Sequence, residues 1–368
     1  MKTFIVRVFV LVIRILYAPM KLRKTQNKIV WLSRQSDTKS QDMEMLSREI
    51  EKISPETKQV FRLKKLKDQT GVSISYIFSV FGDMWHLANS KIAICDTYSI
   101  PVSCLNHKKD LKIVQIWHAL GAIKKFGLQS VGMGGGRSAE TAKILSMHKN
   151  YDCVIAPSEK AGEFYCEAFG CSPDKIKIAS LPRVDVILSG TGRRAEFMQK
   201  NPQCKGKEIY VYLPTFREGD ADAIEKLSRA FEGSKDKVLV ISAHPHSLTE
   251  AYNFAGDFST YDLMKLSDGI ITDYSASAFE ASLLMRPLWF FAPDYDAYLE
   301  ERGLNTDIKE LMSDAFFTDA DELLAAIDSG EYNFDQLNRF SETFVSHRGE
   351  NNTAHLANII CSITDKEI

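Results

Sequence analysis

Short apolar runs separated by longer polar stretches make up most of the chain from Lys28 onward. In the first half these runs lie at residues 29–33, 92–95, 113–117 and 153–156, and in the second half at 209–213, 238–241, 269–272 and 288–291. Continuous short apolar runs are typical of parallel strands buried on both faces. Polar, helix-prone stretches lie between them, including a helix predicted from about Gln41 to Ile53. The pattern therefore predicts an α/β fold with alternating strands and helices.

A polar segment from Ser189 to Gly206, rich in small residues, divides the two series of strands. Because 368 residues suit two domains better than one core, we place a boundary near residue 200. We expect two Rossmann-like domains, at residues 28–200 and 201–368, with helices at the end of the second. Two open sheets in tandem imply a cleft, with ligands at the carboxyl ends of the strands.

Residues 1–24 have a different pattern, with many apolar side chains, six basic residues and no acid. Arg7 and Arg14 interrupt the apolar run that a membrane-spanning helix needs, and no signal-peptide cleavage pattern follows. Arg7, Arg14 and Lys21 are seven residues apart, so a helix places them on one side. We therefore expect residues 1–27 to form a basic amphipathic helix in the membrane interface, with its cations on anionic head groups. The alternative is a buried first helix with two snorkelling arginines.

Overall composition excludes several classes of protein. The formal net charge is only -2, which argues against nucleic acid as a partner. The seven cysteines form no Cys-x-x-Cys pair, so we expect reduced thiols and neither a disulfide framework nor a zinc knuckle.

The sharpest candidate for chemistry follows the predicted strand at 269–272. Asp273 ends this strand, and Ser275 and Ser277 lie where the next helix is expected to begin. Short hydroxyls and free backbone N–H groups at such a helix start can bind a phosphate. The alternative is that one of the serines only caps the helix.

Two histidines also follow predicted strands. His244 comes after the run at 238–241 and precedes Pro245 and His246. Two histidines around a proline are too few ligands to predict a metal site, so we expect His244 to donate to phosphate oxygens or to be a plain surface residue. No metal site is predicted.

His118 follows the run at 113–117, in the first domain, where it would face the second domain's site across a cleft. A histidine suits proton transfer near neutral pH, and Lys124 and Lys125 add positive charge for an anionic substrate. The alternative, a satisfied histidine near the core, is the better interpretation of this stretch alone. The glycine-rich residues 131–137 match neither common nucleotide-loop motif and are interpreted as a mobile loop over the cleft.

Three further polar residues lie near predicted strand ends. Ser158 follows "CVIAP", Arg183 lies in "LPRVD", and Arg217 ends "YVYLPTFR". Each could be a cap or a surface ion pair, although the planar fork of arginine also suits phosphate oxygens.

In this order, seven motifs resemble the CDP-glycerol glycerophosphotransferase family of teichoic acid synthesis. They are "QIWHALGAIKKFG", "YDCVIAPSE", "LPRVDVIL", "YLPTFRE", "AHPH", "SDGIITDYSASAFEA" and "RPLWFFAPDYDAYLEERG", and they span roughly residues 113 to 303. The chain departs from the family pattern in two places. It has Trp-His-Ala-Leu-Gly for Trp-His-Gly-Thr-Pro, and it lacks the second serine after "TDYS", where we expect Ser277 to serve instead.

The resemblance implies a GT-B-like architecture of two Rossmann-like domains, the first on the acceptor side and the second binding the CDP donor. It also implies roles for residues of this chain. His118 resembles the catalytic base, and His244 resembles the histidine that contacts the donor phosphates. The implied donor-binding residues are Thr272, Asp273, Ser275, Ser277, Arg217, Pro214 and Thr215. Lys124, Lys125, Arg183 and Ser158 are further expected contacts to substrate or phosphate.

The implied reaction transfers a polyol phosphate from CDP-glycerol, or alternatively CDP-ribitol, to a hydroxyl of a lipid-linked acceptor and releases CMP. No cofactor beyond the donor substrate is expected. The resemblance implies an acceptor of the undecaprenyl-diphosphate disaccharide type and a peripheral position on the cytoplasmic face of the cell membrane, with a homo-oligomer left open. Two alternatives remain at this point: a GT-B glycosyltransferase that uses a nucleotide sugar, and a membrane-bound scaffold that binds nucleotides without turnover.

Overall fold

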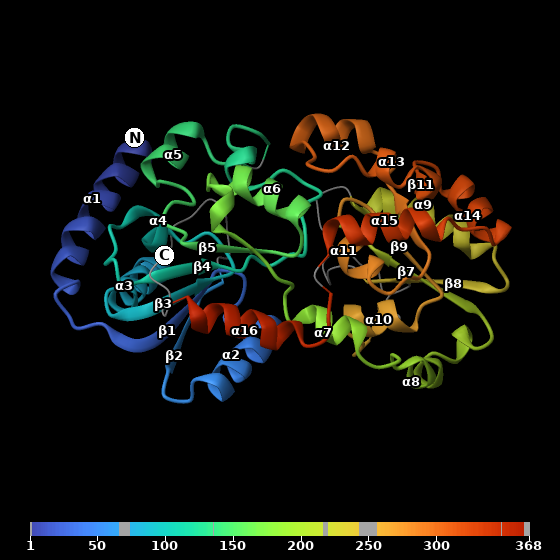
Figure 1. Cartoon of the computed structure of the whole chain (residues 1–368). Helices are drawn as coiled ribbons and strands as arrows, with labels where there is room; N and C mark the ends of the chain where they lie inside the picture. Colours follow the sequence, from blue (N-terminus) through green and yellow to red (C-terminus); the bar gives the residue numbers. More distant parts are fainter. Residues whose placement is uncertain are drawn as a thin grey trace. The chain divides into compact units, whose positions relative to one another are not determined.

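The computed structural model describes residues 2–65, 74–134, 136–215, 220–242, 256–346 and 348–363. Internal contacts divide the chain into two units (Figure 1). Unit 1 comprises Met1–His118, Lys125–Arg183 and His347–Ile368. Unit 2 comprises Ala119–Lys124 and Val184–Ser346.

Unit 1 contains a six-stranded sheet in the order β2-β1-β3-β4-β5-β6, and every pair of neighbours is parallel. Its strands are β1 (Gln26–Ser33), β2 (Lys58–Leu63), β3 (Ser90–Cys95), β4 (Lys112–Gln115), β5 (Cys153–Ala156) and β6 (Ile176–Ile178). All residues of β5 and the last six of β1 are buried, as expected for parallel strands covered on both faces.

The helices of unit 1 are α1 (Lys2–Met20), α2 (Gln41–Ile53), α3 (Ile74–Leu87), α4 (Ile100–Cys104), α5 (Ala139–Ile144), α6 (Glu159–Phe169) and α16 (Asn352–Ser362), with 3-10 turns η1 (Gly127–Ser130) and η2 (Pro173–Lys175). α2 begins where the Ser40 side chain accepts from the Met43 backbone N–H. Met43, Leu46 and Ile50 then form its buried stripe. α16 packs against α2, so the end of the chain belongs to unit 1.

The first helix packs on unit 1 through a narrow stripe of side chains. Val10, Ile13 and Tyr17 are buried, and α1 contacts α3, α4 and α5. Arg14 Nε donates to the Cys104 carbonyl at 2.8 Å, and Arg7 pairs with Glu140 at 2.9 Å. Both arginines therefore contact unit 1, whereas we had expected them to face lipid head groups.

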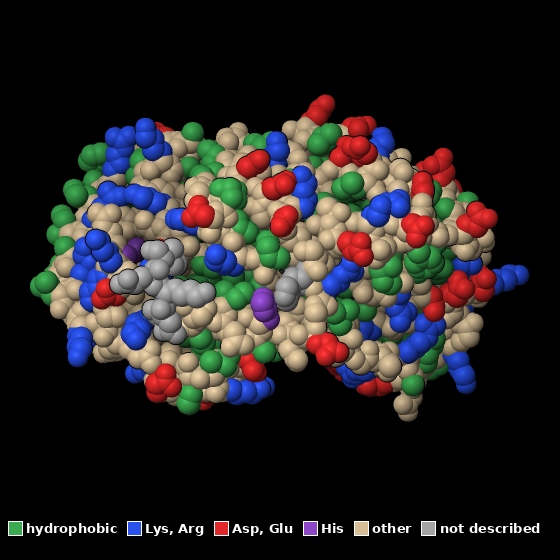
Figure 2. Space-filling model, in the orientation of Figure 1, with side chains coloured by type: hydrophobic (Ala, Val, Ile, Leu, Met, Phe, Trp, Pro, Cys, Tyr) green, Lys and Arg blue, Asp and Glu red, His purple; other side chains and the backbone are tan. Residues whose placement is uncertain are grey.

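The other side of α1 is apolar and exposed. Its exposed side chains are those of Phe4, Ile5, Val8, Leu11, Val12, Ile15 and Leu16. Figure 2 shows hydrophobic side chains along the edge of the molecule over α1, next to Lys and Arg side chains. Among the described helices, α1 is long and apolar enough to cross a membrane by length and composition, a test that signal sequences and core helices also pass.

Unit 2 contains a five-stranded parallel sheet in the order β11-β10-β9-β7-β8. Its strands are β7 (Glu208–Leu213), β8 (Lys237–Ile241), β9 (Gly269–Thr272), β10 (Leu288–Phe291) and β11 (Phe316–Phe317). Its helices are α7 (Arg183–Leu188, whose first residue is the last of unit 1), α8 (Arg194–Lys200), α9 (Asp220–Glu232), α10 (Thr260–Leu266), α11 (Ser277–Ser282), α12 (Tyr295–Arg302), α13 (Ile308–Leu311), α14 (Ala320–Ser329) and α15 (Phe334–Phe344), with 3-10 turns η3 (Pro202–Cys204) and η5 (Ser313–Ala315).

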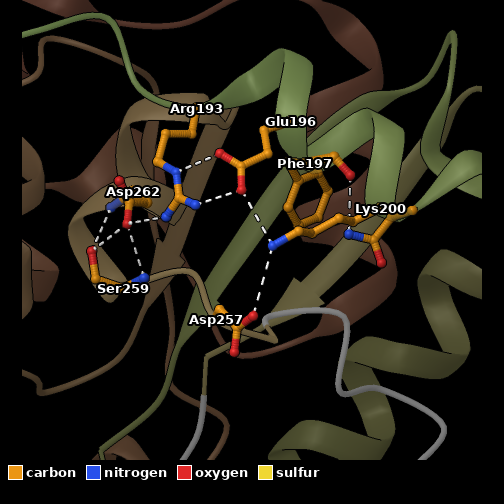
Figure 3. Close-up of polar contacts among 8 residues, drawn as sticks. Arg193, Glu196, Phe197, Lys200, Asp257, Ser259 and Asp262 are labelled. Carbon is orange, nitrogen blue, oxygen red and sulfur yellow. Dashed lines mark hydrogen bonds and ion pairs between the residues drawn. The ribbon is translucent and has the colours of Figure 1, made fainter.

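Ion pairs connect α8 and its N-cap residue Arg193 with α10 and the segment before it (Figure 3). Arg193 pairs with Glu196 and, at 3.6 Å, with Asp262. Lys200 pairs with the same Glu196 and, at 3.7 Å, with Asp257. Such exposed pairs contribute at most about 1 kcal/mol each, so they orient α8 more than they stabilise unit 2.

The α/β prediction and the eight predicted strand positions are confirmed, as is the helix Gln41–Ile53. The units divide the chain differently from the boundary that we placed near residue 200. The chain passes from unit 1 to unit 2 after Arg183, and the final segment returns to unit 1. A short piece of the first half, Ala119–Lys124, packs within unit 2.

Candidate active site

The imidazole of His118 is held at the carboxyl ends of two neighbouring strands of unit 1. β3 and β4 pair in parallel, so Asp96, just after β3, lies beside the segment that follows β4. His118 Nδ1 is 2.9 Å from the Asp96 carbonyl oxygen. Since a carbonyl only accepts, Nδ1 carries the proton in the neutral ring, and Nε2 keeps a lone pair. That tautomer is the one a general base needs.

Burial lowers the pKa of His118 to about 4, and the charge of Arg183 adds to the lowering, while the hydrogen bond to the Asp96 carbonyl opposes it. The ring is therefore neutral at physiological pH. A neutral imidazole with a free Nε2 can accept a proton from a hydroxyl group.

An aromatic layer supports the His118 ring. Trp117 lies against it with ring centroids 4.1 Å apart, and Phe126 and Phe169 pack on Trp117 at 4.8 and 5.3 Å. Trp117 has a left-handed backbone conformation (φ 55°), which is unusual for a bulky residue. Its backbone N–H donates to Gln115 Oε1. This turn ends the strand at Gln115, two residues earlier than the apolar run suggests. It also directs His118 back towards Asp96.

Asp96 is a candidate site residue that our sequence interpretation missed. The side chain is buried; Oδ2 accepts from Ser33 at 2.9 Å, while Oδ1 has no hydrogen-bond partner within the described part of the chain. Burial raises the pKa of its carboxyl group to about 6, against the opposing hydrogen bond from Ser33. A buried, destabilised carboxylate beside a candidate base is typical of functional sites. The sequence does contain a signal for this residue, because an acidic residue directly follows the apolar run at 92–95.

Arg183 is near His118 electrostatically, but its guanidinium is already engaged. Its Nε donates to Asp42 Oδ2 at 2.8 Å, and its backbone N–H donates to Asp42 Oδ1 at 2.8 Å. This partly buried pair ties the end of unit 1 to α2. Arg183 therefore has a structural role and lowers the pKa of His118, while its contact to substrate phosphate stays a prediction.

Ser158 has the cap role that was its alternative interpretation. It is buried, and its hydroxyl accepts from the Ala161 N–H at the start of α6. Its contact to substrate stays a prediction. Lys125 is exposed in unit 1, and its contact to substrate stays a prediction.

In unit 2, the ends of β7 and β9 meet through Thr215 and Asp273. The Asp273 carboxylate, itself buried, accepts from the Thr215 N–H at 2.9 Å and from its hydroxyl at 2.7 Å. Asp273 therefore positions Thr215 and is not itself available at the surface. Pro214, between β7 and Thr215, is half-buried.

Lys124 joins this cluster because the segment Ala119–Lys124 packs within unit 2. Its Nζ donates to the Thr215 hydroxyl at 3.1 Å, and its backbone pairs with Leu304. A side chain at Gly121 would come within 2.5 Å of the Phe279 ring, so this close packing requires glycine. The structure thus brings Lys124 together with Thr215 and Asp273.

The serines after β9 lie at the surface of the same unit, whereas Thr272 does not. Ser275 and Ser277 are half-buried, and the Ser275 hydroxyl contacts both the Ser277 hydroxyl at 3.1 Å and its backbone N–H at 3.3 Å. Thr272 is fully buried and donates to the Leu213 carbonyl at 2.8 Å. Thr272 therefore helps to join β9 to β7, and its donor contact stays a prediction.

Two predicted residues, His244 and Arg217, lie outside the described residues, and their roles stay predictions. Within the described ranges, no group of three or more His, Cys, Asp or Glu side chains could hold a metal ion.

The family model described as CDP-Glycerol:Poly(glycerophosphate) glycerophosphotransferase matches residues 16–362 of this chain. A teichoic acid ribitol-phosphate primase of Bacillus spizizenii is 31% identical over 385 aligned residues, covering 98% of both chains. A teichoic acid glycerol-phosphate primase of Bacillus subtilis is 26% identical and covers 74% of both. A solved structure of the wall teichoic acid polymerase TagF has a TM-score of 0.70 at 18% identity, covering 99% of this chain and 97% of that one, and it supports the GT-B-like fold.

Replacing Asp96 by asparagine is expected to stabilise the protein at pH 7.5. The pKa of the Asp96 carboxyl group is about 6 in the folded protein, against an ordinary value of 3.8. Protonation therefore stabilises the fold fully below pH 3.8, and this gain is lost as the pH rises through about 6. The amide of the Asp96→Asn variant imitates the protonated group and should raise the free energy of unfolding by about 1–3 kcal/mol at pH 7.5.

Urea unfolding of both proteins at pH 7.5 and at pH 4 measures this effect. The difference should shrink at the lower pH. An Asp96→Asn protein that is less stable than wild type at pH 7.5 would contradict the interpretation of Asp96 as a destabilising carboxylate.

Proposed function

We propose, because this chain belongs to the CDP-Glycerol:Poly(glycerophosphate) glycerophosphotransferase family, that it transfers a polyol phosphate from a CDP-activated donor to a hydroxyl of a lipid-linked acceptor. The single observation that supports a role for the described residues is the state of His118. Its ring is neutral and bonds the Asp96 carbonyl through Nδ1, so the lone pair of Nε2 is not used in that bond. The expected acceptor is a polyprenyl-diphosphate disaccharide of the teichoic acid type.

The reaction is a substitution at the donor's distal phosphorus. The acceptor oxygen forms a bond to this phosphorus while the bond to the CMP oxygen breaks, and CMP leaves with the bonding electron pair. The proton of the acceptor hydroxyl passes to His118 Nε2. General base catalysis of this kind contributes about 10²–10⁴-fold in rate, and positioning and charge stabilisation supply much of the rest.

Unit 2 supplies the groups for the donor phosphates. Lys124 contributes a positive charge, and Thr215 contributes the hydroxyl that accepts from it. Ser275 and Ser277 contribute two further hydroxyls, which follow the end of β9. His244 and Arg217 are assigned the same function from their motif positions alone. The GT-B nucleotide-sugar enzyme and the scaffold, which the sequence left open, receive no support from the family match.

Ribitol phosphate is favoured over glycerol phosphate as the transferred group by one observation. The alignment with this chain covers 98% of the ribitol-phosphate primase but only 74% of the glycerol-phosphate primase. We therefore propose CDP-ribitol as the donor and a single addition as the product, with CDP-glycerol as the second candidate.

A lipid-linked acceptor requires the enzyme at a membrane surface, and α1 supplies a means of binding there. Its exposed apolar side chains are those expected of a helix lying in the interface, and its sequence contains no acid. We propose that this face inserts at the cytoplasmic surface of the membrane. The arginines of α1 hold the helix to unit 1, so the apolar side chains provide most of the binding.

The donor and the base are tested by CMP release from CDP-ribitol and, separately, CDP-glycerol, with a polyprenyl-linked disaccharide acceptor in detergent. We expect acceptor-dependent release, faster with CDP-ribitol, and a product heavier by one ribitol phosphate. His118→Gln should lower kcat by about 10²–10⁴-fold with little change in thermal stability, because only the base is lost. Near-normal turnover by His118→Gln would remove the base assignment, and a product with a glycosidic bond would instead indicate a sugar transferase.

Membrane binding is tested by substitution, because deleting the N-terminal residues would expose the core that Val10, Ile13 and Tyr17 cover. The double variant Leu11→Glu/Ile15→Glu should bind phosphatidylglycerol vesicles at least about tenfold more weakly in a sedimentation assay. The matched control Leu299→Glu/Leu311→Glu changes two equally apolar, exposed residues of unit 2 and should bind like wild type. Equal binding by all three proteins would refute the role of α1.

A further inference from the structure

An open groove of about 530 Å³ lies in unit 1 between α5, η1 and the C-terminal end of α6. Apolar groups line most of it, among them Leu128, Val131, Ala139, Met147 and Phe169. This volume lies within the range of small-molecule binding sites. The proposed reaction assigns no occupant to it.

Two lysines lie among the lining residues of this groove. Lys143 on α5 and Lys149 after it are both exposed. Neither ammonium group has an ion-pair partner in the part of the chain that the structure describes. The neighbouring acid of α5, Glu140, is paired with Arg7. The groove therefore combines an apolar lining with two cations that remain available to an anionic ligand.

The backbone that carries Lys149 is held in an unfavourable conformation. Ser146, His148 and Asn150 all have left-handed φ values, of 45°, 62° and 77°. Non-glycine residues seldom adopt this region, and such strain gathers at ligand-binding sites where the surroundings impose it. Here Asn150 Nδ2 donates to the Val102 and Leu105 carbonyls, and His148 Nδ1 hydrogen-bonds the Tyr151 hydroxyl.

The groove is connected on one side with α1 and on the other with His118. α5 packs against α1, and Figure 1 shows α5 between α1 and α6. Phe169, a wall of the groove, contacts the Trp117 ring, and Trp117 contacts the His118 ring. A ligand entering from the apolar face of α1 and lying in the groove would thus be separated from the base by two aromatic residues, Phe169 and Trp117.

We propose that this groove binds the isoprenoid chain of the acceptor next to its diphosphate, with Lys143 and Lys149 on the phosphate oxygens. Burial of the chain's methylene groups provides affinity, and the two lysines place the charged end at the rim. The head group then extends past Trp117 towards His118. This inference rests on the proposed function, because it gives a site to that reaction's acceptor.

Direct binding of undecaprenyl diphosphate in detergent, without donor, tests the groove independently of turnover. Ala139 is exposed at the start of α5 and lines the groove, so Ala139→Trp fills it without entering the core. We expect Ala139→Trp to weaken binding at least about tenfold, and Lys143→Gln/Lys149→Gln to do the same. Ala325→Trp, on an exposed position of α14, is the matched control and should bind like wild type. Thermal unfolding verifies that each variant is folded.

The outcomes separate this inference from the proposed function. Loss of binding in both groove variants supports the site even if no donor yields CMP, in which case only the proposed reaction fails. Equal binding by wild type and the folded groove variants, or no binding by wild type, overturns the site even if transfer is observed. A parallel loss of binding to phosphatidylglycerol vesicles without isoprenoid would also overturn it, since the groove would then hold bulk lipid.

Discussion

The hydrogen bond from His118 Nδ1 to the Asp96 carbonyl is the contact on which the chemistry of this protein depends. It exists because β3 and β4 are parallel neighbours, which brings the residues after both strands to the same edge of the sheet. Its acceptor is a carbonyl oxygen, which fixes the proton of the neutral ring on Nδ1. The turn at Trp117 and its bond to Gln115 then aim the ring. Backbone geometry, more than any charged partner, therefore sets the tautomer and the orientation of the His118 ring.

The sheets of both units follow from apolar patterning, because a strand covered on both faces must be apolar at every position. The strands that the pattern missed show the limit of this rule. β2, with the sequence KQVFRL, lies at the edge of its sheet and is only half-buried, so it need not be apolar throughout. β6 and β11 are three and two residues long, too short to give a signal.

The site was predicted less completely, for reasons that particular residues make clear. Polar residues after strands were recognised, but whether they face a ligand or another part of the protein depends on tertiary partners. Arg183 has Asp42 as its partner, 141 positions away, and Thr272 has the Leu213 carbonyl. Lys124 and Lys125 are adjacent in sequence yet belong to different units. An N-terminal helix was predicted and is present, but it ends at Met20, before Lys21, and its arginines bond to the protein.

The central claim, that His118 is a neutral base with its proton on Nδ1, is tested most directly by the ring nitrogen-15 chemical shifts of histidine-labelled protein, with His118→Gln to assign the signals. The account predicts a protonated Nδ1 and an unprotonated Nε2 at pH 7, and a titration midpoint near pH 4. A proton on Nε2 at pH 7, or a midpoint near the ordinary value of 6.5, would contradict it.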